Sequence, residues 1–159
     1  MSTTGSTPAA TPSLLCVCFL SATAKVYTFL RFGFLQLQDE PNAFAGVAFH
    51  CYDGSPSNQD TFRNAFPNKK IYFTECTGNY GSDWWSDIKW YMDNIMIGAP
   101  EHFAESGLMW NLALDGNGQP ELPGSNSCSP SCRPVVTINS DGSYTLNQEC
   151  KFFEISSST

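Results

Sequence analysis

Glu75 is the residue of this chain whose position best suits catalysis. It closes a short β-rich run, residues 71–75, and the turn-forming residues 76–81 follow directly. In parallel α/β enzymes, catalytic carboxylates lie at the carboxyl ends of the strands. The same local pattern also fits a solvated glutamate at the edge of a loop. The neighbouring elements must therefore decide between the two interpretations.

Two further strand-like runs flank the run that Glu75 closes. Residues 46–52 are apolar and end in the turn formers 53–56, and residues 107–114 are followed by Asp-Gly-Asn-Gly. Because side chains alternate along a strand, His50 and Tyr52 share one face of the first run. These runs predict strands near 46–52, 71–75 and 107–113.

Two helices are predicted between these strands. Ser57 is the expected N-cap of the first helix, which has an apolar face and stops at Pro67. Ser82 is the expected cap of the second, over about 83–97 and ending at Gly98 and Pro100. Its apolar residues recur at helical spacing: Trp84, Ile88, Tyr91, Met92, Ile95 and Met96. The second helix is therefore expected to be the longest regular element, with Trp84 in the core.

Strands that are joined by helices run parallel, and strands this apolar are covered on both faces, so residues 46–114 predict a βαβαβ segment. Such a segment fits an open α/β sheet or a closed barrel. Residues 135–138 and 143–146 then flank an Asp-Gly turn, which predicts a β-hairpin.

Three runs at the ends of these predicted strands resemble glycoside hydrolase family 30. They are His-Cys-Tyr-Asp-Gly at 50–54, Phe-Thr-Glu-Cys-Thr-Gly at 73–78 and Trp-Asn-Leu-Ala-Leu at 110–114. The family includes glucosylceramidases and fungal endo-β-1,6-glucanases, and the fungal members are the most similar. The resemblance covers about residues 38–149. It implies a TIM (β/α)8 barrel, of which this chain would supply the sixth to eighth strands.

The resemblance also implies roles for individual residues. Glu75 would be the catalytic nucleophile of a retaining β-glucosidase, and His50, Tyr52, Trp110 and Asn111 would bind substrate. The Tyr52 hydroxyl would lie near the nucleophile and orient it. The implied reaction is hydrolysis of the O-glycosidic bonds of β-linked glucose, in a glucan or in glucosylceramide, without a metal or cofactor.

Strand alternation gives a further expectation for the site. If Glu75 points into the barrel, Ile71 and Phe73 share its face, whereas Thr74 and Cys76 point toward the helices.

Retaining hydrolysis needs a second carboxyl group, about 5 to 5.5 Å from the first. The resemblance implies that this acid/base Glu follows an Asn upstream of the nucleophile, and no Asn-Glu pair precedes Glu75. Asp53 closes a strand at the appropriate end and is expected to assist sugar binding or its own turn. Glu105 is expected to precede the third strand, at the opposite end of the barrel.

The length of the chain predicts an incomplete barrel. A complete (β/α)8 barrel takes about 250 residues, and commonly at least 200, whereas this chain has 159. We therefore expect a partial glycoside hydrolase domain at 38–149, between an unassigned N-terminal segment at 1–37 and an unassigned tail at 150–159. The chain alone is expected to be inactive. The alternative is a remnant that binds carbohydrate without catalysis.

Cysteine content and the family resemblance predict a secreted protein. Seven cysteines favour an oxidising compartment, and Cys128 and Cys132 could close a small loop disulfide. With two histidines in the chain, a zinc site is not expected. Residues 14–24 form an apolar run that fits a signal peptide, although a helix over 14–37 is also possible. Charged residues interrupt the longer stretch, so no membrane span is expected.

Charge and aromatic content narrow the choice of partners. The net charge of −7 and the pI near 4.6 disfavour nucleic acid and anionic surfaces. Aromatic residues make up 14% of the chain, and Trp84, Trp85 and Trp90 could provide surfaces for sugar rings. For Trp84 the helical pattern favours the core instead. A carbohydrate or glycolipid substrate is therefore the expected partner.

Overall fold

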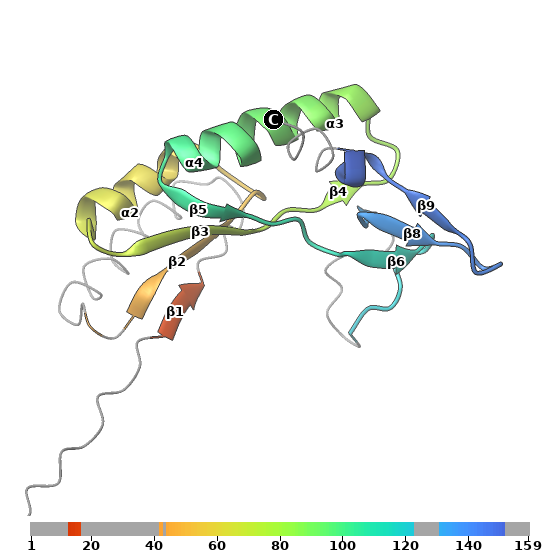
Figure 1. The fold of residues 1–159 in the computed structure, drawn as a ribbon, viewed down its shortest axis with the longest axis horizontal. Coiled ribbons are helices and arrows are strands. Elements are labelled where there is room, and N and C mark those ends of the chain that lie inside the picture. The colour runs from red at the N-terminus through yellow and green to blue at the C-terminus, as the bar shows by residue number, and fades with distance from the viewer. Residues whose placement is uncertain (1–12, 17–41, 43, 123–130, 152–159) are drawn as a thin grey trace, which may run out of the picture.

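The computed structural model describes residues 13–16, 42, 44–122 and 131–151. A parallel sheet carries helices α2 (Gln59–Ala65), α3 (Trp84–Tyr91) and α4 (Ala99–Glu101) along one side. Two smaller sheets lie beyond the carboxyl end of the parallel strands (Figure 1). The chain is thus a mixed α/β structure, as the sequence predicts.

The parallel sheet has the strand order β1-β2-β3-β5. Its members are β1 (Ser13–Cys16), β2 (Phe44–His50), β3 (Lys70–Glu75) and β5 (Ala104–Gly107), and each neighbouring pair is parallel. The parallel strands predicted near 46–52 and 71–75 are confirmed. A helix over 14–37 is contradicted at its start, because Ser13–Cys16 form strand β1. Residues 17–37 lie outside the described part of the chain.

The third strand lies earlier than predicted. Strand β5 ends at Gly107, and residues 113–115 form a separate strand, β6 (Ala113–Asp115), in another sheet. Between them the N–H groups of Leu108 and Trp110 still bond to the carbonyls of Phe73 and Cys76. Asn111 then adopts a φ of 70°, which breaks an extended run. The apolar pattern of 107–114 therefore spans two strands.

The crossover between β2 and β3 is helical. It consists of a 3₁₀ turn, η1 (Pro56–Asn58), and of α2 (Gln59–Ala65). The helical turn begins at the N-cap Ser55, two residues before the predicted cap Ser57, because proline suits the first position of a helix.

The crossover between β3 and β5 is the longest helical segment. It runs through α3 (Trp84–Tyr91), the π-helical stretch η2 (Met92–Gly98) and α4 (Ala99–Glu101). The predicted stop at Gly98 and Pro100 is wrong. The backbone changes to π spacing, and Pro100 falls in the first turn of α4, where a missing N–H is tolerated.

The N-cap of α3 is Asp83 instead of Ser82. The Asp83 carboxylate accepts a hydrogen bond of 2.8 Å from the Ser86 N–H, and Ser82 donates to the Asn79 carbonyl. Both residue types cap helices well, so the local pattern did not distinguish them.

The hydrophobic core lies between the parallel sheet and the helices. Its buried members include Val47, Phe49, Ile71, Phe73, Cys76, Phe62, Phe66, Ile88, Tyr91 and Ile95. Met92 and Met96 pack partly buried against it, as the helical stripe predicts. The prediction for Trp84 is wrong, because 45% of this residue is exposed and its ring stacks on Trp85.

Ile71 and Phe73 lie on the face of β3 that packs against the helices. Glu75 lies on the opposite face. The pairing of β2 with β3 matches Phe49 with Phe73 and then His50 with Glu75, so β3 contains one extra residue at this point. A bulge of one residue reverses the alternation of side chains. The expected grouping of Ile71 and Phe73 with Glu75 is therefore wrong, whereas the expected position of Cys76 on the helix side is confirmed.

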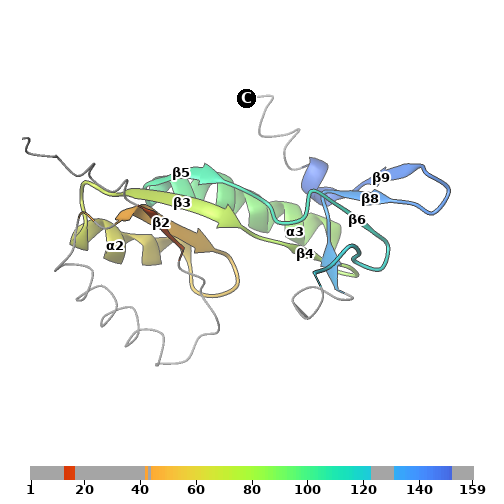
Figure 2. The same cartoon turned by 90° about the horizontal axis from the view of Figure 1, so that it is seen from below.

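Two small sheets complete the described part. Strand β4 (Gly78–Asn79) is antiparallel to β7 (Cys132–Arg133). Strand β8 (Val136–Ile138) is parallel to β6 and antiparallel to β9 (Tyr144–Leu146). The predicted hairpin is thus confirmed, and Gly142 provides the positive φ of its turn. Figure 2 shows this hairpin projecting from the end of the structure farthest from α2.

A buried ion cluster joins α3 to the C-terminal strands. Arg133 and Glu149 expose 4% and 1% of their surface, and the Arg133 guanidinium donates to both Glu149 carboxylate oxygens. It also donates to the Asp87 carboxylate at 2.6 Å and to the Asn79 carbonyl at 2.5 Å. The cluster fixes the segment that follows Glu75 in the chain against the first turns of α3.

Candidate functional site

Glu75 lies at the carboxyl end of β3, and two side chains of the neighbouring strand end contact its carboxylate. The Tyr52 hydroxyl donates a hydrogen bond of 2.7 Å to Glu75 Oε1. His50 Nδ1 lies 3.7 Å from the same oxygen, beyond a hydrogen bond but within ion-pair range when the imidazole is protonated. A quarter of the Glu75 side chain is exposed, compared with 6% for His50. The carboxylate is therefore oriented and still open to solvent.

The local backbone explains why these side chains meet. His50 and Tyr52 share one face of the chain by alternation, and the bulge in β3 turns Glu75 toward that face. The Cys51 N–H also donates to the Glu75 carbonyl at 3.2 Å. The two strand ends thus remain paired at the residues that carry the polar side chains.

A disulfide between Cys51 and Cys76 links the same strand ends. The Cα atoms of the two residues are 5.2 Å apart, and both residues lie on the helix side of the sheet. This bond was not predicted from the sequence. Its signal was the position of each cysteine at the end of an adjacent parallel strand. Cys132 is also disulfide-bonded, but its expected partner Cys128 lies outside the described residues, so that pairing stays a prediction.

Trp110 approaches the site from the segment after β5. Its ring centroid is 6.5 Å from that of Tyr52, with an angle of 71° between the ring planes. The backbone N–H of Trp110 donates a hydrogen bond of 2.7 Å to the Cys76 carbonyl. The structure therefore brings Glu75, Tyr52, His50 and Trp110 together at one end of the sheet, as predicted.

Asn111 follows Trp110 directly, at the position with positive φ. Its carbonyl accepts a hydrogen bond of 3.0 Å from the Val135 N–H, which ties the site segment to the C-terminal part of the chain. The substrate-binding role of Asn111 stays a prediction, as do the roles of Glu75, His50, Tyr52 and Trp110.

The carboxylates of Asp53 and Glu105 both have local partners. Asp53 Oδ1 accepts a hydrogen bond of 2.7 Å from the Gly54 N–H, so this carboxylate stabilises its own turn. Glu105 lies within β5 and pairs with Lys70 at the start of β3. The predicted separation of Glu105 from Glu75 is therefore confirmed, although Glu105 lies inside the third strand and not before it.

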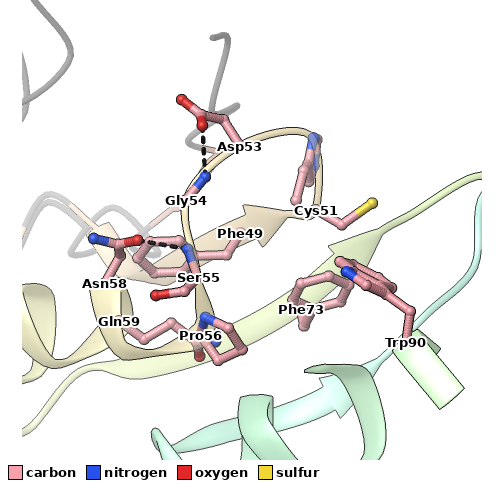
Figure 3. Close-up of a pocket in the computed structure, with 11 residues that line it drawn as sticks. Phe49, Cys51, Asp53, Gly54, Ser55, Pro56, Asn58, Gln59, Phe73 and Trp90 are labelled. Atoms are coloured by element: carbon pink, nitrogen blue, oxygen red, sulfur yellow. Dashed lines mark hydrogen bonds between the residues drawn. The ribbon is translucent and has the colours of Figure 1, made fainter. Parts of the chain in front are cut away.

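A small pocket lies between the end of β2, the turn that follows it and Trp90 of α3 (Figure 3). Its lining includes Phe49, Cys51, Phe73 and Trp90, and its volume of about 20 Å³ is enough for one water molecule. Gln59 also lines it, and its buried Oε1 has no hydrogen-bond partner among the described residues. His50 and Asp53 also line this pocket, but Glu75 and Tyr52 do not, so the carboxylate itself lies outside it.

The described residues contain no group of three or more His, Cys, Asp or Glu side chains that could hold a metal ion. Within the same residues, none of the helices has both the length and the apolar character that a membrane crossing requires.

No protein-family model and no curated protein matches the chain. Solved structures are similar to it, among them the following two. The endo-β1,6-glucanase BT3312 superposes with a TM-score of 0.63 and 23% identity, over 74% of this chain and 27% of that protein. SrfJ from Salmonella typhimurium superposes with a TM-score of 0.62 and 25% identity, over 77% of this chain and 28% of that protein.

These similarities support a fold like that of glycoside hydrolase family 30, the family that the three sequence motifs resemble. The chain spans between a quarter and a third of the length of each solved structure. The superposition thus covers most of this chain but a minor part of each matched protein.

Proposed function

We propose that this chain contributes the nucleophile-bearing part of a retaining β-glucosidase site, with Glu75 as the nucleophile. The observation that carries the proposal is the hydrogen bond from the Tyr52 hydroxyl to Glu75 at the carboxyl end of a parallel strand. Active sites of (β/α)8 enzymes lie at that end of the strands. The fold similarity to an endo-β1,6-glucanase supports the same reading.

In this proposal the parallel sheet is part of a (β/α)8 barrel, with the barrel domain over about 38–149. The alternation of parallel strands and helices from β2 to β5 supports a barrel segment. Segments 1–37 and 150–159 lie outside this proposed domain, although Ser13–Cys16 of the first segment pairs with β2 as strand β1.

In this proposal the two carboxylate oxygens of Glu75 have different tasks. Tyr52 and His50 both approach Oε1, which leaves Oε2 to attack the anomeric carbon of the sugar. The attack breaks the bond to the leaving oxygen and forms a covalent glycosyl-enzyme, which water then hydrolyses. Trp110 and Asn111 would line the sugar-binding side of the site.

In this proposal the second carboxyl group, the general acid and base, would come from a part of the barrel other than these 159 residues. It must protonate the leaving oxygen and then activate the water, whereas Asp53 and Glu105 are engaged with Gly54 and Lys70. This observation favours the second candidate function for the 159 residues alone, a carbohydrate-binding part without catalysis. For the chain alone we expect no detectable hydrolysis, because a missing general acid costs about 10²- to 10⁴-fold in rate.

The first substrate to test is a β-1,6-linked glucan, because one similar structure is an endo-β1,6-glucanase. Glucosylceramide is the second. We also propose that the protein works in an oxidising compartment outside the cell, since a disulfide joins the two strand ends of the site.

A hybrid enzyme tests the proposal. Residues 44–151 of this chain replace the matching part of the endo-β1,6-glucanase, and hydrolysis of β-1,6-glucan is measured. We expect Glu75→Gln to abolish turnover, and Glu105→Gln, at the opposite end of the sheet, to leave it unchanged. Turnover that survives Glu75→Gln in a hybrid that is otherwise active would exclude Glu75 as the nucleophile.

A further inference from the structure

Two tryptophans at the start of α3 form an exposed aromatic surface outside the candidate site. Trp84 and Trp85 expose 45% and 66% of their surface. Their rings are stacked, with centroids 5.7 Å apart and planes 10° from parallel. Large aromatic side chains that remain exposed side by side on a protein surface commonly mark a binding site.

The backbone beneath this pair is held in place by polar contacts. The Asp83 carboxylate caps the helix through the Ser86 N–H, and the Ser82 hydroxyl donates to the Asp87 carboxylate at 2.6 Å. The buried Arg133 guanidinium donates to both Ser82 and Asp87. A rigid first turn presents the two indoles without a further ordering cost when a ligand binds.

Charge restricts the class of ligand. Asp83 and Asp87 flank the two tryptophans in the first turn of α3, and the nearest basic residue along the helix is Lys89. An acidic surrounding repels phosphate-bearing ligands such as nucleic acid and anionic lipid. Asp87 is paired with the buried Arg133, so the exposed Asp83 carboxylate is the acceptor that a ligand can reach. A flat aromatic surface beside this carboxylate fits an uncharged ligand that carries hydroxyl donors.

We propose that Trp84 and Trp85 form an accessory binding surface for a β-linked glucan chain, remote from the reacting bond. The axial C–H groups of a β-glucose ring give it an apolar face that stacks on an indole, while its equatorial hydroxyls donate to neighbouring acceptors. The outer face of Trp85, the more exposed of the two rings, is the main contact. The identity of the sugar as glucose rests on the proposed function.

The test uses the 159-residue chain and a β-1,6-linked glucohexaose, with binding followed through the indole N–H signals in NMR spectra. We expect Trp85→Ala to weaken binding about fivefold or more, since an aromatic stacking contact has about this value. Trp90→Ala is the matched control, because Trp90 lies on the same helix with 40% exposure, and it should bind as the unmodified chain does. Equal affinity of Trp85→Ala and the unmodified chain would overturn the proposal.

Oxidation of the unmodified chain by N-bromosuccinimide provides a readout without any variant. We expect the hexaose to protect Trp84 and Trp85 from oxidation, and not Trp90, as read by peptide mass spectrometry. Protection of Trp90 alone, or protection by phosphatidylglycerol vesicles instead of the hexaose, would overturn the proposal. Glu75→Gln should leave this protection unchanged, so that failure of the nucleophile assignment and failure of the aromatic surface give different results.

Discussion

Replacing Arg133 with Met removes the cation of the buried ion cluster. The Arg133 side chain exposes 4% of its surface and the Glu149 side chain 1%. The closest contacts of the guanidinium with carboxylates, at 2.6 Å, reach one oxygen each of Glu149 and Asp87. After the substitution, the Tyr91 hydroxyl still donates to Glu149 at 2.8 Å, but no cation is left among these contacts.

The expected cost follows from burial. Removing one partner of a buried ion pair leaves an uncompensated charge and destabilises a protein by about 3–5 kcal/mol. Because a domain of this kind has a total stability of about 5–15 kcal/mol, Arg133→Met should remove a large part of it. Replacing both buried partners, in Arg133→Met with Glu149→Leu, should restore much of the loss. The carboxylate that then lacks a cation, Asp87, has a side chain that is 20% exposed, and it still accepts from the Ser82 hydroxyl.

Urea unfolding followed by far-UV circular dichroism measures these changes. The control is Lys70→Met, which breaks the exposed pair of Lys70 and Glu105, whose side chains are 56% and 45% exposed, and should leave the midpoint nearly unchanged. The reasoning would be refuted if Arg133→Met were no more destabilising than Lys70→Met. It would also be refuted if the double variant were less stable than Arg133→Met alone.

Three further predictions concern stability. Burial next to a carboxylate raises the pKa of Tyr91 above its ordinary value of 10.0, so the folded state favours the neutral phenol. The stabilisation that comes from the neutral Tyr91 phenol should be fully present below pH 10 and be lost as the pH rises further. The urea midpoint should therefore fall between about pH 8 and about pH 11, and Tyr91→Phe should make this fall smaller. A Cβ at Gly78 would lie 2.7 Å from the Tyr91 hydroxyl, whereas one at Gly116 would meet no atom within 4 Å. Gly78→Ala should therefore lower the thermal midpoint more than Gly116→Ala does. Equal midpoints for these two variants would contradict this prediction. Replacing both Cys51 and Cys76 with Ala opens a loop with a sequence separation of 25. This should lower the free energy of unfolding in urea by about 3 kcal/mol. An unchanged free energy of unfolding would show that the disulfide does not stabilise the fold.

The regular elements could be predicted where local pattern and packing agree. The apolar runs that form β2 and β3 are bounded by turn residues, and the stripe of Ile88, Tyr91 and Ile95 matches one helical face. The Asp-Gly hairpin follows from the same kind of local signal. These features needed no knowledge of distant contacts.

The errors arose where one residue changes the backbone or the environment. Asn111 breaks the run 107–114 through its positive φ, and the apolar pattern gives no sign of this. The bulge before Glu75 reverses a face that strict alternation would keep. Trp84 continues the helical stripe in sequence, but it stacks on Trp85 instead of entering the core.

The residues of the candidate site came from motif resemblance, and their geometry came from the structure. The positions of Glu75 and Tyr52 at strand ends predict that they lie near each other, whereas the 2.7 Å contact depends on the bulge in β3. The disulfide next to them required pairing two cysteines 25 residues apart, which no local pattern specifies.

Covalent labelling tests the assignment of Glu75 most directly. The hybrid enzyme is incubated with an activated 2-deoxy-2-fluoro-β-glucoside, whose good leaving group forms the glycosyl-enzyme and whose fluorine slows its hydrolysis. We predict one added sugar, located on Glu75 by peptide mass spectrometry, and no addition in Glu75→Gln. A label on another carboxylate, such as Asp53, would contradict the account.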